Sequence, residues 1–274
     1  MDPEIASFYA LGLEAERLWT WGRLERVRTQ ELLARFLPSA PATVLDVGGG
    51  PGAYALWLAR RGYAVRLIDP VELHAAQARE ASVAQADAPL DGVEVGDARE
   101  LPAADRSADA VLLLGQLYHL PEAADRDRAL HEARRVLRPG GRVLAAAISY
   151  FAPTIDGIRN AKLDEPGFEA LIEHDLRAGI HRNPDATPGW FTTAFFHRPE
   201  QLGAEVEAAG FALEALVAIE GVGHYAVGAD AWLDDPARRD ALLRAIRRVE
   251  AEPALLGASP HLLAVGRAPA AELK

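Results

Sequence analysis

One segment, residues 43–58, constrains the fold of this chain more than any other. It reads TVLDVGGGPGAYALWL: apolar β-formers around the acid Asp46, then the glycine-rich run 48–52, then apolar residues at helical spacing. Glycine permits a positive φ and lets a ligand approach the main chain where a Cβ would collide. A helix that follows such a turn begins with free N–H groups. The segment therefore predicts a strand, a tight turn and a helix that together bind a small ligand.

The glycine spacing alone leaves the class of ligand open. Gly48, Gly50 and Ala53 fit the dinucleotide fingerprint G-x-G-x-x-G/A, and Asp69 follows about 20 residues later, where that fingerprint places an acid for the ribose. A glycine-rich turn without a ligand is a further alternative. The rest of the chain has to decide between these classes.

Composition excludes several kinds of partner. The 274 residues carry a net charge of −11 and no basic tract, so we expect no nucleic acid partner, because phosphate binding needs clustered Lys and Arg. The chain has no cysteine, which rules out disulfides, thiolate nucleophiles and zinc–cysteine sites. No H-x-x-x-H or HExxH spacing occurs, and we expect no metal. Because we find neither a signal peptide nor a run of about 20 apolar residues, we expect a cytoplasmic protein without a membrane partner.

Strands and helices alternate through the first half of the chain. Two predicted helices, over 4–13 and 20–37, form an N-terminal helical cap within residues 1–40. After them, apolar runs alternate with helical patterns: strands at 44–47, 63–69, 93–95, 108–114 and 142–149, and helices over 53–59, 71–85 and 122–137. The run 108–114 is apolar almost throughout, as in a central strand buried on both faces. This rhythm predicts an α/β fold with a doubly wound, Rossmann-like parallel sheet.

The alternation stops at residue 150 and resumes at residue 199. Residues 150–198 are too aromatic for a solvated linker, and an insertion after the carboxyl end of a strand lies where open α/β sheets bind ligands. We interpret this helical and loop segment as a lid over the substrate; a cap that only stabilises the fold is the alternative. The remaining predicted elements complete a mostly parallel sheet of seven strands in a domain of residues 41–149 and 199–267: helices over 199–209 and most of 229–252, and strands over 211–220 and 260–266.

Several motifs follow one another along the chain: VLDVGGGPG (44–52), Asp69, GDARELP (96–102), DAVLLLGQLYHL (109–120) and ARRVLRPGGRVL (133–144). The late helix and strand RPEQLGAEVEAAGFALEAL (198–216) complete the set. In this order and spacing the motifs resemble those of class I S-adenosylmethionine-dependent methyltransferases of the small-molecule type, over roughly residues 20–267.

This resemblance implies S-adenosylmethionine as the cofactor and S-adenosylhomocysteine as the product. It implies that Asp46 or a nearby carbonyl faces the methionine ammonium, and that Asp69 accepts hydrogen bonds from the ribose hydroxyls. Asp97 then accepts from the adenine amino group. The full set of predicted cofactor residues is Asp46, Gly48, Gly50, Gly52, Asp69, Pro70, Asp97, Ala98, Gly115, Gln116 and Arg28.

A nicotinamide-dependent oxidoreductase explains fewer features. Its fingerprint accounts for the glycine turn and Asp69, but not for Asp97 or the turn at 137–141. No Tyr-x-x-x-Lys pair is present, since Tyr150 is followed by Thr154 and the only lysines are residues 162 and 274. A cofactor-binding module without catalytic activity is a third class, against which the aromatic insertion argues weakly.

Methyl transfer is an in-line displacement, so the enzyme mainly has to position a nucleophile, which can supply roughly 7–11 kcal/mol. A base is needed only where the nucleophile carries a proton, as a hydroxyl does. His119 after the fourth strand and His224 are the candidate bases, because histidine exchanges a proton near neutral pH. We expect transfer to an oxygen or nitrogen nucleophile, in secondary metabolism by family analogy, with a C-methyltransferase as the alternative.

Aromatic residues favour a flat or apolar small molecule as the substrate, because rings stack on rings. The aromatic side chains of the insertion equally suit its own core. We expect the protein to act as a monomer or homodimer. The predicted substrate residues are Tyr9, Tyr118, His181, Trp190, Phe195 and Tyr225.

Overall fold

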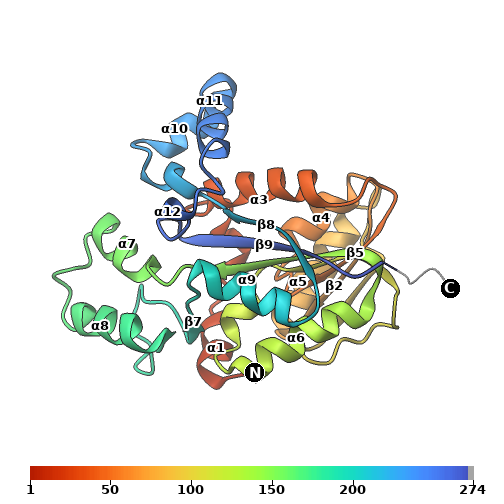
Figure 1. Cartoon of the computed structure of the whole chain (residues 1–274), viewed down its shortest axis with the longest axis horizontal. Helices are drawn as coiled ribbons and strands as arrows, with labels where there is room; N and C mark the ends of the chain where they lie inside the picture. The colour runs from red at the N-terminus through yellow and green to blue at the C-terminus, as the bar shows by residue number, and fades with distance from the viewer. Residues whose placement is uncertain (271–274) are drawn as a thin grey trace.

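A seven-stranded sheet forms the centre of the computed structural model, which describes residues 1–270 (Figure 1). Five strands run parallel from one edge inward, while β9 is antiparallel to both of its neighbours, β5 and β8. The predicted doubly wound, mostly parallel fold is confirmed. In spatial order the strands are β3 (Gly92–Val95), β2 (Ala64–Asp69), β1 (Thr43–Val47), β4 (Ala108–Leu113), β5 (Leu137–Ile148), β9 (His261–Arg267) and β8 (Ala212–Ala218).

Helices cover both faces of this sheet. On one face, α6 (Ala123–Val136) and α9 (Pro199–Ala208) pack on alternate strand residues such as Val111 and Leu113. On the other face, α3 (Arg23–Phe36), α4 (Ala53–Ala59) and α5 (Glu72–Ala84) pack on the intervening residues, among them Leu112. Because successive side chains of a strand point to opposite faces, the apolar β4 is buried on both sides, as its sequence predicts.

Two predicted helices have different bounds in the structure. The helix expected over 4–13 ends at Tyr9 as α1 (Pro3–Tyr9). After Gly12, which adopts a φ of +71°, a short helix that was not predicted follows, α2 (Glu14–Arg17). The stretch 229–252 becomes α10 (Ala229–Asp234) and α11 (Pro236–Arg247), and α12 (Pro253–Leu256) follows. Asp235 starts α11 by accepting hydrogen bonds from the main-chain N–H groups of the next turn. No helix within residues 1–270 combines the length and apolar character that crossing a bilayer requires.

The insertion after β5 folds into two helices and a short hairpin. These are α7 (Ala152–Arg159), α8 (Phe168–Ala178), β6 (Ile180–His181) and β7 (Ala194–Phe195), which extend from one end of the sheet in Figure 1. The N-terminal segment is attached to this insertion. The Asn183 main-chain N–H donates to the Glu4 carboxylate at 2.8 Å, and Arg182 pairs with Asp2 at 3.0 Å. The segment before the first strand and the insertion between β5 and β8 therefore contact each other in space.

Arg28 was predicted to bind the cofactor, but its side chain is fully buried and does not line the pocket described below. Its Nε donates to the main-chain oxygen of Ile219 at 2.8 Å. Its two remaining nitrogens pair with Glu31 and Glu250, each at 2.6 Å. The guanidinium thus ties α3 to the end of β8 and to the segment after α11, and these contacts use its donors.

Replacing this arginine tests the structural role. We expect Arg28→Met to lower the free energy of unfolding by about 3 kcal/mol, because it removes one partner of a buried ion pair. Arg35→Met is the matched control, since Arg35 also pairs with Glu250 but is more exposed, and its loss should lower stability by less than about 1 kcal/mol. Urea unfolding measures both. If Arg28→Met is as stable as the wild type but binds the cofactor more weakly, Arg28 has the role in cofactor binding that the sequence predicts.

Candidate functional site

A pocket of about 400 Å³ follows the edge of the sheet at which the parallel strands end. Antiparallel β9 begins at that same edge, so its first residue, His261, joins the lining. We call the portion at the ends of β3, β2, β1 and β4 the β3–β4 half, with Asp97, Asp69, Asp46, Gly48–Gly50, Gly115 and Gln116. The portion beyond it is the β5–β8 half, with Arg17, Glu25, Tyr118, Ala146, Ile219 and His261.

The glycine turn presents bare main chain to the β3–β4 half. Gly48 and Gly50 have φ values of +72° and +56°. A Cβ on Gly48 would lie 1.8 Å from Nε2 of Gln116, and a Cβ on Gly49 would lie 2.7 Å from Oδ2 of Asp46. The turn therefore packs directly on two predicted cofactor residues. Gly52 has a φ of +93° and starts α4, but it does not line the pocket.

Asp69 is a fixed carboxylate beside this turn. Its Oδ2 accepts from the Gly50 N–H at 2.9 Å, and its Oδ1 accepts from the Val71 N–H at 2.8 Å. His74 Nδ1 lies 3.3 Å from Oδ1. A carboxylate oxygen can accept more than one hydrogen bond, so Asp69, which lines the pocket together with Pro70, retains capacity for a ligand hydroxyl.

Asp46 is a buried acid that lines the pocket and is 1% exposed. Within residues 1–270 its Oδ2 has no hydrogen-bond partner. Burial, together with the nearby charge of Asp69, raises the pKa of Asp46 to about 7. Two neighbouring carboxylates, one of them with an orphaned oxygen, suit a ligand that carries positive charge. These two carboxylates therefore fit the ammonium and sulfonium groups of S-adenosylmethionine.

Asp97 lines the pocket at the end of β3, but Arg99 engages its carboxylate. Arg99 donates to it from NH2 at 2.7 Å and from Nε at 2.9 Å, and the same guanidinium holds Asp125. The hydrogen bonds from Arg99 lower the pKa of Asp97. The amino group of a ligand that approaches Asp97 therefore has to share the carboxylate with Arg99. Ala98 is buried and lies outside the pocket lining.

His119 and Tyr9 meet inside the pocket. His119 belongs to the 3-10 turn η1 (Leu117–His119), and its Nδ1 donates to the carbonyl oxygen of Thr193 at 3.2 Å. Its Nε2 therefore accepts the hydroxyl proton of Tyr9, at 2.6 Å. Burial lowers the pKa of His119 to about 4 and raises that of Tyr9. His119, a predicted base, is thus a neutral imidazole whose Nε2 lone pair already accepts the Tyr9 hydroxyl. Its catalytic role stays a prediction.

Three predicted substrate residues of the insertion do not reach the pocket. Of the residues that the structure describes, none between 150 and 198 is part of the lining. His181 is buried, with Nδ1 2.7 Å from a carboxylate oxygen of Asp175. Trp190 donates to Glu165, and Phe195 lies under the guanidinium of Arg126 at 3.7 Å. These side chains form the insertion's own core and its contacts with the sheet domain.

His224 and Tyr225 also lie outside the pocket lining. They belong to a 3-10 turn, η2 (Gly221–Tyr225), that follows β8. Tyr225 is half exposed and donates its hydroxyl to the main-chain oxygen of Ala258 at 2.8 Å. The chain turns away from the sheet edge here, and this removes both residues from the predicted site.

The N-terminal segment, and not the insertion, covers the pocket. Residues of α1, of α2 and of the turn after them line it, including Ile5, Tyr9, Glu14, Arg17 and Trp19. A Cβ on Gly50 would lie 3.6 Å from Cγ of Glu14, which places α2 over the glycine turn.

Arg17 is the centre of a charged cluster that the sequence did not reveal. Its Nε lies 3.0 Å from Glu14, and its NH1 and NH2 lie 2.5 Å and 3.0 Å from the two oxygens of Glu25. His261 and Glu25 both line the same half of the pocket. Positions 17, 25 and 261 share no motif, so no local pattern connects them.

The buried Asp46 predicts a pH dependence of stability. Its pKa is higher in the folded protein than in the unfolded chain, so its stabilising contribution is complete below about pH 4 and is lost as the pH rises through 7. Between pH 5 and pH 8 the free energy of unfolding of the wild-type protein should fall by about 2.5 kcal/mol relative to that of Asp46→Asn. Urea unfolding without cofactor measures this difference. Asp91→Asn, at an exposed turn, should parallel the wild type, and an Asp46→Asn curve that does the same contradicts the assignment.

Comparison with known proteins finds methyltransferases. A family model described as a methyltransferase domain matches residues 45–145. Methyltransferase GfsG of Streptomyces halstedii is 37% identical over 139 residues, which are 50% of this chain and 48% of that protein. Ubiquinone/menaquinone biosynthesis C-methyltransferase UbiE of Acidiphilium cryptum is 35% identical over 140 residues, 51% of each chain. The chain thus spans about half the length of the curated relatives it matches.

Solved structures share the fold at low identity. A SAM-dependent methyltransferase from Methanosarcina mazei is similar with a TM-score of 0.59 and 18% identity, over 87% of this chain and 97% of that one. The [4+2]-cyclase SpnF is similar with a TM-score of 0.56 and 20% identity, over 90% and 82%. Residues 45–145 thus match a methyltransferase domain, and the chain is similar in fold to S-adenosylmethionine-dependent methyltransferases.

Proposed function

We propose that this protein transfers the methyl group of S-adenosylmethionine to an oxygen or nitrogen nucleophile of a small molecule. The observation that carries this proposal is the continuity of the pocket. Its β3–β4 half fits a cationic nucleotide-like cofactor, and its β5–β8 half offers further space with charged and aromatic walls under the N-terminal segment. An in-line displacement needs two adjoining sites of this kind.

The residues of the β3–β4 half would hold the cofactor. Asp69 would accept from its ribose hydroxyls, Asp97 from its adenine amino group, and the main chain of Gly48–Gly50 would lie along its amino-acid portion. Asp46 would offer its unpaired oxygen to the ammonium. When bound, the cofactor supplies a methyl group activated by positive sulfur. The protein then has to orient the nucleophile and to keep water out of the closed pocket.

The β5–β8 half would hold the methyl acceptor. Tyr118 is almost fully buried at its wall, and Ile219 and Ala146 add apolar surface. The pocket has an ordinary volume for a small ligand and lies under a cover, which argues against a protein chain as the substrate. His119 would act through Tyr9, whose hydroxyl it holds, and would thereby shape the acceptor space.

Carbon is the alternative acceptor. The relative from Acidiphilium cryptum is named a C-methyltransferase, and this name supports the alternative for the present chain. The fold by itself does not settle the chemistry, since the similar SpnF structure is that of a [4+2]-cyclase. The experiments below therefore test cofactor binding separately from methyl transfer.

Cofactor binding has a direct test. S-adenosylhomocysteine at about 100 times its dissociation constant should stabilise the protein by roughly 2.7 kcal/mol, a rise in Tm of about 5–10 °C. Asp69→Asn should weaken this binding by about tenfold or more, because the amide carries no negative charge and offers the ribose hydroxyls one acceptor oxygen fewer than the carboxylate. Asp91→Asn is the matched control and should bind normally. NAD and NADP should produce no shift, and a shift with either nucleotide alone would overturn the proposal.

A further inference from the structure

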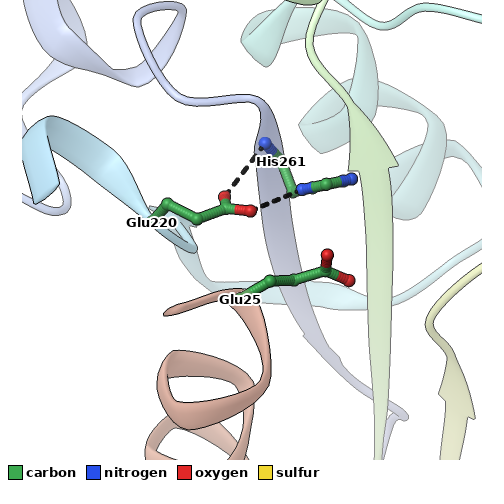
Figure 2. Close-up of side chains that lie close together, drawn as sticks. All are labelled: Glu25, Glu220 and His261. Carbon is green, nitrogen blue, oxygen red and sulfur yellow. Dashed lines mark hydrogen bonds and ion pairs between the residues drawn. The ribbon is translucent and has the colours of Figure 1, made fainter. Parts of the chain in front are cut away.

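His261 is a histidine that the motifs did not single out. It is the first residue of β9 and lines the β5–β8 half, on the sheet edge where the predicted cofactor residues lie. In the part of the chain that the structure describes, its side chain forms a hydrogen bond through Nδ1, which lies 2.7 Å from Oε1 of Glu220. Figure 2 shows the other ring nitrogen, Nε2, directed away from Glu220. The ring thus has one nitrogen anchored and one available.

Glu220 is itself held in place. Its Oε2 accepts from the Ser259 hydroxyl at 3.2 Å and from the His261 main-chain N–H at 3.3 Å. Glu220 is 4% exposed, and Ser259 is fully buried. A buried carboxylate that fixes the Nδ1–H tautomer of a histidine leaves the Nε2 lone pair free to accept a proton when the ring is neutral.

Glu25 faces this pair from α3, as Figure 2 shows. One potential ligand atom from each of Glu25, Glu220 and His261 lies within 4.8 Å of the other two, which is a spacing that could also hold a metal ion. However, both oxygens of Glu25 already accept from Arg17, and Nδ1 of His261 donates to Glu220. These partners favour proton chemistry at the cluster.

We propose that His261, oriented by Glu220, is the catalytic base that takes the proton from a hydroxyl group of an aromatic acceptor. This inference rests on the proposed function. The acceptor oxygen forms a bond to the methyl carbon, the carbon–sulfur bond breaks with its electron pair passing to sulfur, and the hydroxyl proton moves to Nε2. The positive charge lost at sulfur is thus matched by an imidazolium, next to the carboxylates of Glu220 and Glu25.

The surroundings of His261 match a weakly acidic hydroxyl. Burial of His261 disfavours its imidazolium form, and the nearby charge of Arg17 acts in the same direction. The carboxylates of Glu220 and Glu25 outweigh both effects and raise the pKa of His261 to about 9. His224 is the other titratable group whose charge is coupled to it. A phenol has a pKa of about 10, so proton transfer to this histidine is nearly balanced, whereas His119, at about 4, is a much weaker base. Tyr54, Tyr118 and Trp19 on the pocket wall suit an aromatic ring.

The experiment compares acceptors that differ in acidity. Wild-type protein is given labelled S-adenosylmethionine with phenol, 4-nitrophenol, aniline or an active-methylene compound. His261→Gln should lower kcat on phenol by about 100-fold or more, but by less than about tenfold on 4-nitrophenol, which ionises without a strong base. His131→Gln, on the exposed face of α6, is the matched control and should behave as the wild type.

The pH profile separates a base from a structural residue. The rate on phenol should rise with pH up to about 9, because only roughly a tenth of His261 is neutral one unit below its pKa. Glu220→Gln, a change at a positioning residue, should shift this rise to lower pH, since it removes a carboxylate that favours the imidazolium. Binding of S-adenosylhomocysteine by each variant shows that the protein is folded.

Several outcomes overturn the inference. If S-adenosylhomocysteine binds but the label reaches only aniline or carbon acceptors, or no hydroxylated acceptor at all, the base assignment is wrong and the cofactor function stands. Equal losses on phenol and 4-nitrophenol, with an unchanged pH profile, also contradict it. Stimulation by Mn²⁺ or Mg²⁺ that disappears in His261→Gln would assign the cluster to a metal. If S-adenosylhomocysteine does not bind, the proposed function itself fails.

Discussion

The parallel pairing of β1 with β2 and β4 is the constraint on which the rest of the molecule depends. It aligns Asp46 with Leu67 of β2 and Leu112 of β4, so the three strands end together. The ladder continues one step into the turn, where the Gly48 N–H donates to the carbonyl of Ile68 at 2.6 Å. Main-chain hydrogen bonds thus fix the start of the glycine turn before any side chain contributes. The pocket exists because strand ends and turns converge at this edge.

Charge is distributed unevenly along that edge. In the β3–β4 half the acids stand close together, and burial together with the neighbouring Asp69 keeps the pKa of Asp46 high. In the β5–β8 half Arg17 pairs with Glu25, and His261 pairs with Glu220. A cofactor that carries positive charge would relieve the first half, whereas the acids of the second half already have basic partners within the protein. This difference gives the two halves separate chemical characters within one continuous space.

Much of the fold was predictable because its signals are local. The apolar run of β4, the glycine turn and the Asp-Pro start of α11 each depend on neighbouring residues, and the structure has all three elements. The end of the first helix at Tyr9 and the short helix α2 were missed, because the turn between them depends on a single glycine with positive φ.

Most of the pocket residues that were predicted follow strand ends, and Tyr9 of α1 is a predicted pocket residue that does not. Asp69 and Gly48 lie in the pocket because parallel strands place them there. The role of Arg28 was mispredicted, since the direction of its side chain depends on Glu250, far away in sequence. The aromatic side chains of the insertion matched a lid by composition alone, but composition does not determine which surface a segment covers.

The position of β9 has a consequence for how the molecule assembles. The last strand in sequence lies between β5 and β8, so β8 is hydrogen-bonded to the sheet only through β9. The five parallel strands, in contrast, make all their pairings with one another within residues 43–148. Contacts between distant parts of a chain form late, because loop closure has to precede them. We therefore expect His261 to reach the pocket later in folding than Asp69 and Gly48, whose strands pair within residues 43–148.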